Sequence, residues 1–150
     1  MQYWKIHAIG ICTAIFATFA GFGCGESKPK AVELLKPEVL KIVEQIVAER
    51  PQIELWEEPE INSMWIYVKL RLQFTPTNYA QVQEETDAVC ERIVIRLQHI
   101  GINARKEWLA VHVDARRPAS QSITGADQVT LYGESSYSFA EDRVTFEIQK

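Results

Sequence analysis

The sequence has few cysteines and lacks the familiar catalytic motifs. Three cysteines in 150 residues are too few for the disulfide framework of a small secreted domain. No Gly-x-Ser-x-Gly, His-Glu-x-x-His or P-loop motif occurs in the chain. The three histidines, one of which is His7 near the N-terminus, do not fall at metal-ligand spacing. The sequence therefore favours a protein without chemistry of its own, and it predicts no catalytic residue, metal or cofactor.

Positive charge is also scarce. Sixteen lysines and arginines stand against twenty acidic residues, which gives a net charge of −4. Residues 1 to 24 contain Lys5 and no acid, so the remainder of the chain is more acidic still. An acidic body without a basic run exerts little attraction on phosphate backbones. We therefore expect no nucleic-acid partner.

Only one long apolar run is present, and it lies at the N-terminus. The eighteen residues from Ile6 to Gly23 carry no formal charge with His7 neutral, and Lys5 precedes them. A positive head, an apolar stretch and a junction of small residues are the layout of a secretory signal. The junction Gly21-Phe22-Gly23-Cys24 resembles the lipobox of a bacterial lipoprotein signal in an imperfect form, since that pattern prefers Leu at position 21 and a small residue at position 22.

This resemblance implies that a signal peptide, residues 1–23, is removed and that Cys24 is acylated and anchors the chain to the membrane. Residues 24–30 are then the lipidated cysteine and a polar tether, whose six residues after Cys24 reach about 20 Å when fully extended. Because Gly25 follows the cysteine, the resemblance further implies the periplasmic side of the outer membrane in a bacterium that has one. Cleavage without acylation would instead leave a soluble periplasmic protein, and an uncleaved segment would be a single transmembrane anchor. All three alternatives place the remaining residues outside the cytoplasm.

The rest of the chain shows two helical and several strand patterns. Apolar spacing predicts a helix from about Pro37 to Arg50, and a second helix capped by Thr77 or Asn78 and closed by Gly101. Strict alternation predicts long strands over residues 64–74 and 109–114, and two further strands over 128–132 and 143–149, whose hairpin the Ser-rich stretch between them can extend. The acidic residues 52–61 are typical of a solvated loop.

These elements predict a single α+β domain over residues 31–150. We expect two helices packed on one face of a roughly four-stranded, mixed, largely antiparallel sheet, with a ferredoxin-like plait as one realisation. The middle strand, helix and strand would form a crossover. Val68 and Val111 are predicted to lie in the core.

Isolated reactive side chains have structural interpretations. Cys90 lies in the apolar stripe of the second helix, which favours a buried and inert thiol. His99 lies near the end of that helix, where an imidazole commonly contacts free carbonyl groups. Alternation places His112 and Asp114 on one strand face, and a serine from the Ser120-Gln121-Ser122 loop would complete a hydrolase-like set only if that loop folds back.

The strongest functional indication is a surface. If both helices cover one side of the sheet, the other side is predicted to present a partner-binding set, Trp65, Tyr67, Lys69, Arg71, Trp108 and His112. Aromatic residues with arginine are the composition of binding hot spots. The alternative is that Ile53, Leu55 and Trp56 cover this side. The leading hypothesis is a lipid-anchored cell-envelope protein that binds another envelope component; a small-ligand or cell-wall-glycan binding domain is the alternative, and a hydrolase is third.

Overall fold

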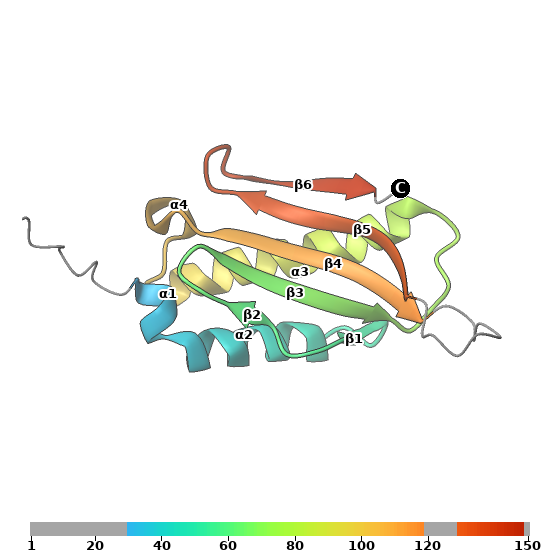
Figure 1. The fold of residues 1–150 in the computed structure, drawn as a ribbon, viewed down its shortest axis with the longest axis horizontal. Helices are drawn as coiled ribbons and strands as arrows, with labels where there is room; N and C mark the ends of the chain where they lie inside the picture. Colours follow the sequence, from blue (N-terminus) through green and yellow to red (C-terminus); the bar gives the residue numbers. More distant parts are fainter. Residues whose placement is uncertain (1–29, 119–128, 149–150) are drawn as a thin grey trace, which may run out of the picture.

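The computed structural model describes residues 30–118 and 129–148. In this part the chain forms four helices and a mixed sheet of six strands (Figure 1). The helices are α1 (Ala31–Leu34), α2 (Lys36–Ala48), α3 (Tyr79–His99) and α4 (Ala104–Glu107). The strands are β1 (Ile53–Leu55), β2 (Glu60–Ile61), β3 (Trp65–Leu72), β4 (Ala110–Pro118), β5 (Val129–Ser138) and β6 (Arg143–Ile148). The predicted α+β class is confirmed, although the sheet has more strands than the four expected.

The strands follow the order β1-β3-β4-β5-β6, and β2 pairs with β3 beside β1. The pair of β3 and β4 is parallel, and the four other pairs are antiparallel. This confirms a mixed and largely antiparallel sheet. The helix α3 connects β3 to β4, and these two strands are direct neighbours. A ferredoxin-like plait splits such a crossover with another strand, so the plait is not the topology of this chain.

The two additional strands lie in the acidic segment that was predicted to be a solvated loop. Ile53 pairs with Leu72 and Ile61 pairs with Ile66, and both isoleucines are buried. Glu54 and Glu60 pair with β3 at positions that point away from the core. The two short strands, each with one buried isoleucine, thus form the edge of the sheet. They are stable there because the long strand β3 supplies backbone hydrogen-bond partners, which such short strands lack by themselves.

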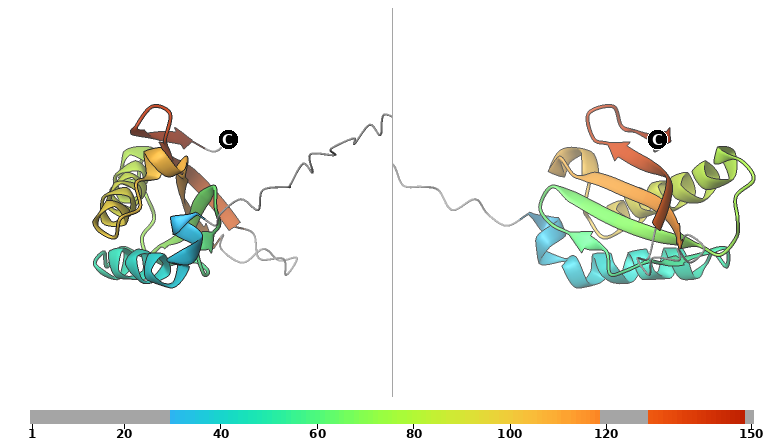
Figure 2. Two further views of the ribbon diagram at one scale, coloured as in Figure 1. Left: turned by 90° about the vertical axis from the view of Figure 1, so that its left-hand side faces the viewer. Right: turned by 45° about the vertical axis from the view of Figure 1, so that its right-hand side comes forward.

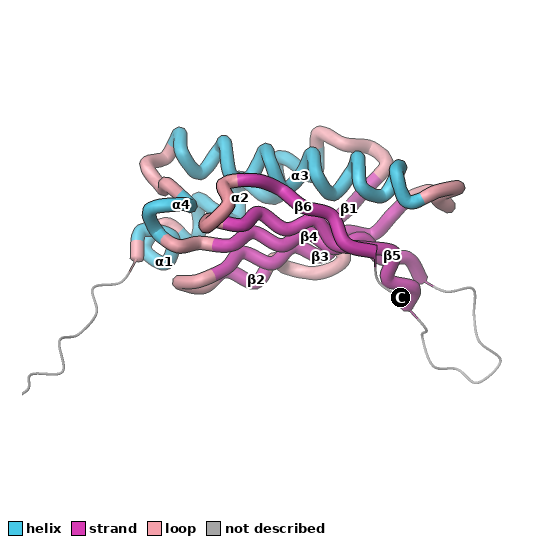
Figure 3. The backbone as a smooth tube through the Cα atoms, turned by 90° about the horizontal axis from the view of Figure 1, so that it is seen from above, coloured by secondary structure: helices cyan, strands magenta, loops and turns pink. Residues whose placement is uncertain are grey.

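Both long helices cover the same face of the sheet, as the left view of Figure 2 shows. The side chains of Val68 and Val111 point into this interface and are fully buried, as predicted. Ile46 from α2 and Ile93 and Leu97 from α3 are also without solvent exposure. The opposite face of the sheet lies free of helices in the described part of the chain (Figure 3).

The helix boundaries follow the local signals in the sequence. Pro37 lies in the first turn of α2, where its missing N–H is not needed, and α1 is a separate turn before it. The Asn78 side chain accepts a hydrogen bond of 3.1 Å from the backbone N–H of Gln81 and so caps α3. Gly101 follows this helix with φ of 87°, the left-handed conformation that a glycine adopts without strain. The predicted cap and stop of the second helix are therefore confirmed.

The strands β5 and β6 form the hairpin expected at the C-terminal end of the chain. The Ser-rich stretch belongs to β5, which extends to Ser138. A register shift between Ala115 and Arg116 marks a bulge in the pairing of β4 with β5. Gly133 lies beside this bulge, where a Cβ atom would come within 2.5 Å of the Phe146 ring. This glycine therefore allows the Phe146 ring to cross β5 closely.

No helix within residues 30–118 and 129–148 combines the length and the apolar character that crossing a membrane requires. The predicted signal peptide, the lipobox at Cys24 and residues 25–29 of the tether lie outside the described residues, and so does the loop with Ser120 and Ser122.

Candidate binding face of the sheet

The helix-free face of the sheet presents alternate residues of the three central strands. We call this surface the open face and define it by Trp65, Tyr67, Lys69, Arg71, His112, Asp114, Arg116, Glu134 and Ser136. The pairing of the strands places these residues side by side, because Tyr67 pairs with His112 and His112 pairs with Ser136. Five of the six residues predicted to bind a partner lie on this surface, and the sixth, Trp108, does not.

A buried carboxylate lies at the centre of the open face. Asp114 is fully buried although no helix covers it. Its Oδ2 accepts hydrogen bonds of 2.5 Å from the Tyr67 hydroxyl and 2.7 Å from the Arg116 guanidinium. Burial, with the hydrogen bond to Asp114 as the next cause, raises the pKa of Tyr67 to about 12. The hydrogen bond to Asp114 likewise raises the pKa of Arg116. Tyr67 is therefore a neutral donor at neutral pH, and the three side chains form a fixed cluster.

His112 belongs to a second cluster. Its Nδ1 lies 2.7 Å from Glu134 Oε1 and 3.0 Å from Ser136 Oγ, and Ser136 donates a hydrogen bond of 2.8 Å to the same carboxylate oxygen. The contact with His112 lowers the pKa of Glu134. In a catalytic triad the acid and the serine occupy opposite nitrogens of the imidazole. Here both contact Nδ1, so the geometry does not activate the serine as a nucleophile.

The structure thereby corrects the predicted grouping of His112 with Asp114. The two residues share a face, as alternation predicts, but their side chains have different partners. The serine beside His112 is Ser136 of β5, whereas Ser120 and Ser122 lie outside the described residues. Antiparallel pairing of β4 with β5 brings Ser136 directly opposite His112. That register depends on the bulge in the pairing of β4 with β5, where Tyr132 is the extra residue, and the sequence pattern did not reveal it.

The acidic edge segment neutralises the lysine and arginine of β3. Lys69 forms ion pairs with Glu57 and Glu60, which raise its pKa, and its ammonium lies 5.3 Å from the centre of the Tyr67 ring. The hydrogen bond from Lys69 is the main cause that lowers the pKa of Glu57. At this edge of the open face, the positive charge of Lys69 therefore lies between the negative charges of Glu57 and Glu60.

Trp56 covers part of this edge. The Arg71 guanidinium lies 4.6 Å from the centre of the Trp56 ring, and its Nε lies 3.3 Å from Glu54 Oε1. The predicted alternative, that Ile53, Leu55 and Trp56 fold over the open face, is therefore met by Trp56 alone. Ile53 and Leu55 belong to β1 and pack with the core on the helical side. The rest of the open face has no cover within the described part.

Trp108 lies at one end of the sheet and not on the open face. The prediction extended the alternation of β4 back to residue 108, but α4 ends there and Trp108 has φ of 56°, in the left-handed region. This conformation turns the indole out of the strand pattern. Trp108 is 70% exposed, and its ring stacks on Phe139 with 5.9 Å between the ring centres.

Cys90 has the buried environment that the sequence predicted, and His99 lies at the helix end as expected. Cys90 is fully buried in α3, and its thiol lies 3.6 Å from the carbonyl oxygen of Val111. Burial raises the pKa of Cys90 to about 12, so that the reactive thiolate is suppressed. His99 is the exposed last residue of α3.

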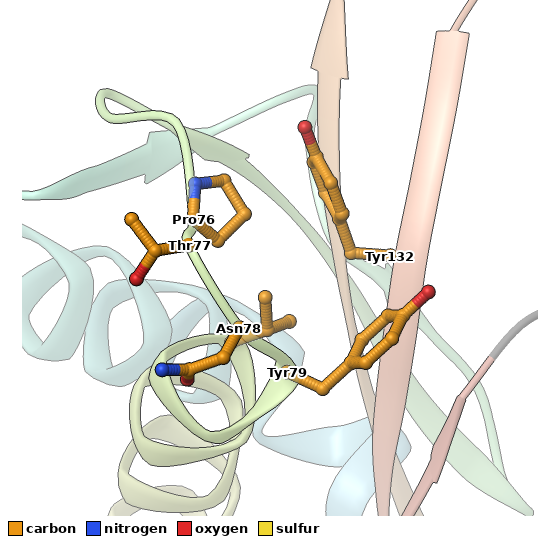
Figure 4. A pocket seen from close by; sticks show the side chains of 6 residues that line it. Pro76, Thr77, Asn78, Tyr79 and Tyr132 are labelled. Atoms are coloured by element: carbon orange, nitrogen blue, oxygen red, sulfur yellow. The ribbon is translucent and has the colours of Figure 1, made fainter.

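Three cavities of the described part lie away from the open face. One of about 240 Å³ is lined by residues 76–79, Val82 and Tyr132, and Figure 4 shows the two tyrosine rings at its wall. Another of about 230 Å³ lies between α3 and β6, and a third of about 400 Å³ is lined by polar residues around Phe74. The first two are smaller than typical ligand pockets. Among the described residues, no group of three potential metal ligands is clustered.

Comparisons with family models, with curated proteins and with solved structures give no match to this chain.

Three residues of the open face were not predicted from the sequence: Arg116, Glu134 and Ser136. Arg116 follows Asp114 by two positions, so extending the strand pattern as far as Pro118 would have found it. Glu134 and Ser136 alternate with the buried Ser135 and Tyr137. This signal was present, and the Ser-rich stretch was expected to extend the hairpin, but none of its residues was assigned to the predicted binding face.

Proposed function

We propose that the protein is a lipid-anchored component of the bacterial cell envelope that binds another envelope protein through the open face of its sheet. The observation that carries this proposal is the contrast between the two faces of the sheet. One face packs against α2 and α3. The other face has no helical cover and presents two polar clusters, one around Tyr67 and one around His112. An antiparallel-rich sheet that leaves one face open offers it to water or to a partner.

The clusters favour binding over catalysis. Each ionic group of the open face has a partner within the chain, and the pKa of Tyr67 is raised to about 12, away from a value that suits proton transfer at neutral pH. The internal hydrogen bonds hold the side chains in one arrangement before any partner arrives. Preorganised side chains lose little conformational entropy on binding, so such a surface is suited to recognition.

The charge pattern favours a protein partner. Lys69 lies opposite Asp114 on β4, Asp114 lies opposite Glu134 on β5, and Arg116 lies beside Asp114. Trp65 adds a partly exposed indole. A partner with charges in the complementary order would gain specificity as well as contact area. The cavities described above lie elsewhere, which gives the glycan or small-ligand alternative less support.

The membrane anchor is proposed from the N-terminal sequence. The apolar run that ends at Gly23-Cys24 supports acylation of Cys24, and a single acyl chain binds membranes only marginally. Stable attachment therefore calls for the several chains that the lipoprotein resemblance implies. Mass spectrometry of the membrane-extracted protein would test this point, and an unmodified Cys24 would contradict it.

Partner binding is tested by photo-crosslinking in cells. A photoreactive amino acid at position 65 should give a discrete crosslinked product, whereas the same amino acid at position 79 should not. Trp65 and Tyr79 are both exposed aromatic residues, but Tyr79 is the first residue of α3 and lies outside the open face. The second position therefore controls for nonspecific crosslinking of exposed aromatic sites.

A matched pair of double variants completes the test. Trp65→Ser with Arg71→Ser should abolish the crosslinked or co-purified partner, while Tyr79→Ser with Arg92→Ser should retain it. Arg71 and Arg92 have similar side-chain exposure, 40% and 47%, and each forms an ion pair with a glutamate. If both double variants fold and both retain the partner, the open face is not the binding surface.

A further inference from the structure

The start of the described chain is fixed at one end of the sheet. The Lys30 ammonium donates a hydrogen bond of 2.7 Å to the carbonyl oxygen of Glu107, the last residue of α4. Figures 1 and 3 show α1, α4 and the turn between β5 and β6 together at this end. The chain that precedes Lys30 therefore leaves the domain beside Trp108, the residue after α4.

The same end carries a concentration of exposed apolar side chains. Among the described residues, seven large hydrophobic side chains are exposed, and four of them belong to segments at this end: Leu34 (65%), Met64 (55%), Trp65 (38%) and Trp108 (70%). The backbone N–H of Ala110 bonds to the Met64 carbonyl oxygen at 2.9 Å, which places the β2–β3 turn next to the start of β4. The indole of Trp108 continues this surface onto Phe139.

Trp108 occupies a backbone conformation that a large side chain rarely adopts. Its φ of 56° is left-handed, a region that costs an L-residue energy and that glycine occupies freely. Packing in the core does not explain the tryptophan here, because the ring is largely exposed. A strained and exposed aromatic residue is the kind of outlier from which a functional role is properly inferred.

The length of the tether limits what can lie against this end. The six residues from Gly25 to Lys30 reach at most about 20 Å beyond an anchored Cys24. The surface around Trp108, where the tether enters the domain, is therefore the part of the domain nearest to the bilayer. Tryptophan is enriched at the headgroup level of membranes. Beside Trp108, α4 presents the exposed Lys106, and the exposed Arg105, which pairs with Asp142.

We propose that this end, formed by Met64, Trp108 and Phe139, docks on the lipid surface and inserts the Trp108 indole at the headgroup level. The inference rests on the proposed anchor at Cys24 and adds the orientation of the domain to it. A bilayer fits these residues because they are amphipathic or apolar, lie beside basic side chains and occupy the end that the tether holds close to the membrane.

The test uses the full chain, purified from membranes and reconstituted into vesicles of phosphatidylethanolamine and phosphatidylglycerol, with and without brominated acyl chains. Brominated lipids quench the emission of a tryptophan that contacts them. One variant retains Trp108 alone, with Trp4, Trp56 and Trp65 replaced by phenylalanine. The matched control retains Trp56 alone, because Trp56 packs on Arg71 along the sheet edge and not at the tether end.

We expect brominated lipid to lower the Trp108 emission about twofold, since an indole at the headgroup level lies next to the acyl chains. The Trp56 emission should not change. If the Trp108 chain floats with the vesicles but its emission is the same with and without bromine, the docking inference is overturned while the anchor stands. Equal quenching of Trp56 and Trp108 would also overturn it, because the orientation would then not be specific.

Two further controls keep the outcomes distinct. If the chain does not float with the vesicles and Cys24 is unmodified, the anchor and the docking inference both fail. A chain that retains Trp65 alone repeats the measurement if circular dichroism shows that the Trp108 chain is unfolded. Quenching of Trp65 above that of Trp56 would support docking, and quenching no greater than that of Trp56 would overturn it.

Discussion

The substitution Val111→Asp places a carboxyl group at the centre of the sheet, where the consequences can be worked from the structure. Val111 is fully buried between β4 and α3, and it pairs with Ile66 and Tyr137 on the neighbouring strands. The new side chain is similar in size to valine, so steric effects are small. Its charge would lie in an apolar environment without a cation, and the folded protein is therefore expected to hold the carboxyl in its protonated form.

The cost follows from the pH. A carboxyl with an ordinary pKa of about 3.9 requires about 4 kcal/mol to stay protonated at pH 7, because each pH unit contributes about 1.4 kcal/mol. The neutral carboxyl still lacks hydrogen-bond partners, which adds about 1–3 kcal/mol. The expected loss of about 5–7 kcal/mol is comparable with the whole unfolding free energy of many domains, about 5–15 kcal/mol. Little folded variant should remain at neutral pH.

The pH dependence of stability distinguishes the cost of a buried, protonated carboxyl from simple misfolding of the variant. The pKa of the introduced carboxyl is raised in the folded state, so the folded chain binds more protons than the unfolded chain between the two pKa values. Stability relative to the wild type should then fall as pH rises, by about 1.4 kcal/mol per unit, and the variant should regain about 3 kcal/mol between pH 7 and pH 5. Urea unfolding followed by circular dichroism at both pH values measures this difference.

Two other variants serve as controls for Val111→Asp. Ile148→Asp changes a side chain of β6 that is 46% exposed, so we expect a small loss of stability without the same pH dependence. Val111→Thr replaces one buried methyl group with a hydroxyl and should cost about 2 kcal/mol. It keeps the measurement possible if Val111→Asp does not fold. A Val111→Asp protein with the wild-type unfolding midpoint at pH 7 would refute the assignment of this face to the core.

Four other outcomes are expected. Arg116→Met should lower the free energy of unfolding in urea by about 3 kcal/mol, because it leaves the buried Asp114 without its cation. Asp114→Asn should cost less, because the side chain of Arg116 is 23% exposed and can be solvated. Equal losses would contradict this asymmetry. Cys90, whose pKa burial raises to about 12, should react with a thiol reagent at pH 8 only as the protein unfolds, and rapid labelling of the folded chain would contradict its burial. Asn78→Ala should lower stability by about 1 kcal/mol through loss of the helix cap, which an unchanged melting temperature would disprove. The pKa of Glu134 is lowered in the folded protein, so its contribution to stability is present above the ordinary carboxyl pKa and is lost as pH falls through the folded pKa. Glu134→Gln should therefore reduce the loss of stability measured by unfolding from pH 6 to pH 3. An unaltered pH profile would count against this explanation.

The sequence predicts the elements whose side chains repeat over many residues. The alternation from Ile66 to Leu72 and the stripe of α3 each contain several buried positions, so a single exception does not hide the period. Pro37, Asn78 and Gly101 mark boundaries because each has a local backbone requirement that is independent of the rest of the fold. These features depend on neighbouring residues in the chain and can be recognised without tertiary information.

The features that escaped prediction depend on contacts between distant segments. The strands β1 and β2, of three and two residues, are too short to show a period, and they exist because β3 offers a free edge. The hydrogen bond from Tyr67 to Asp114 joins residues 47 positions apart through the register of two strands. Trp108 was misplaced because alternation assumes an extended backbone, whereas α4 ends there in a left-handed turn. The composition of the open face was thus predictable in part, but the pairing within it was not.

The two proposals constrain one another through the direction of the strands. The strands run along the long axis of the molecule, and the chain enters the domain at one end of that axis (Figure 1). If that end lies on the lipid surface, β3 and β4 lead away from the bilayer and the open face is turned sideways, parallel to the membrane normal. A partner anchored in the same membrane can then contact Tyr67 and His112 by lateral diffusion, without release of the lipid anchor. If the proposed tether of about 20 Å and the docked Trp108 fix the height of the open face above the bilayer, lengthening the tether should weaken the capture of such a membrane-bound partner.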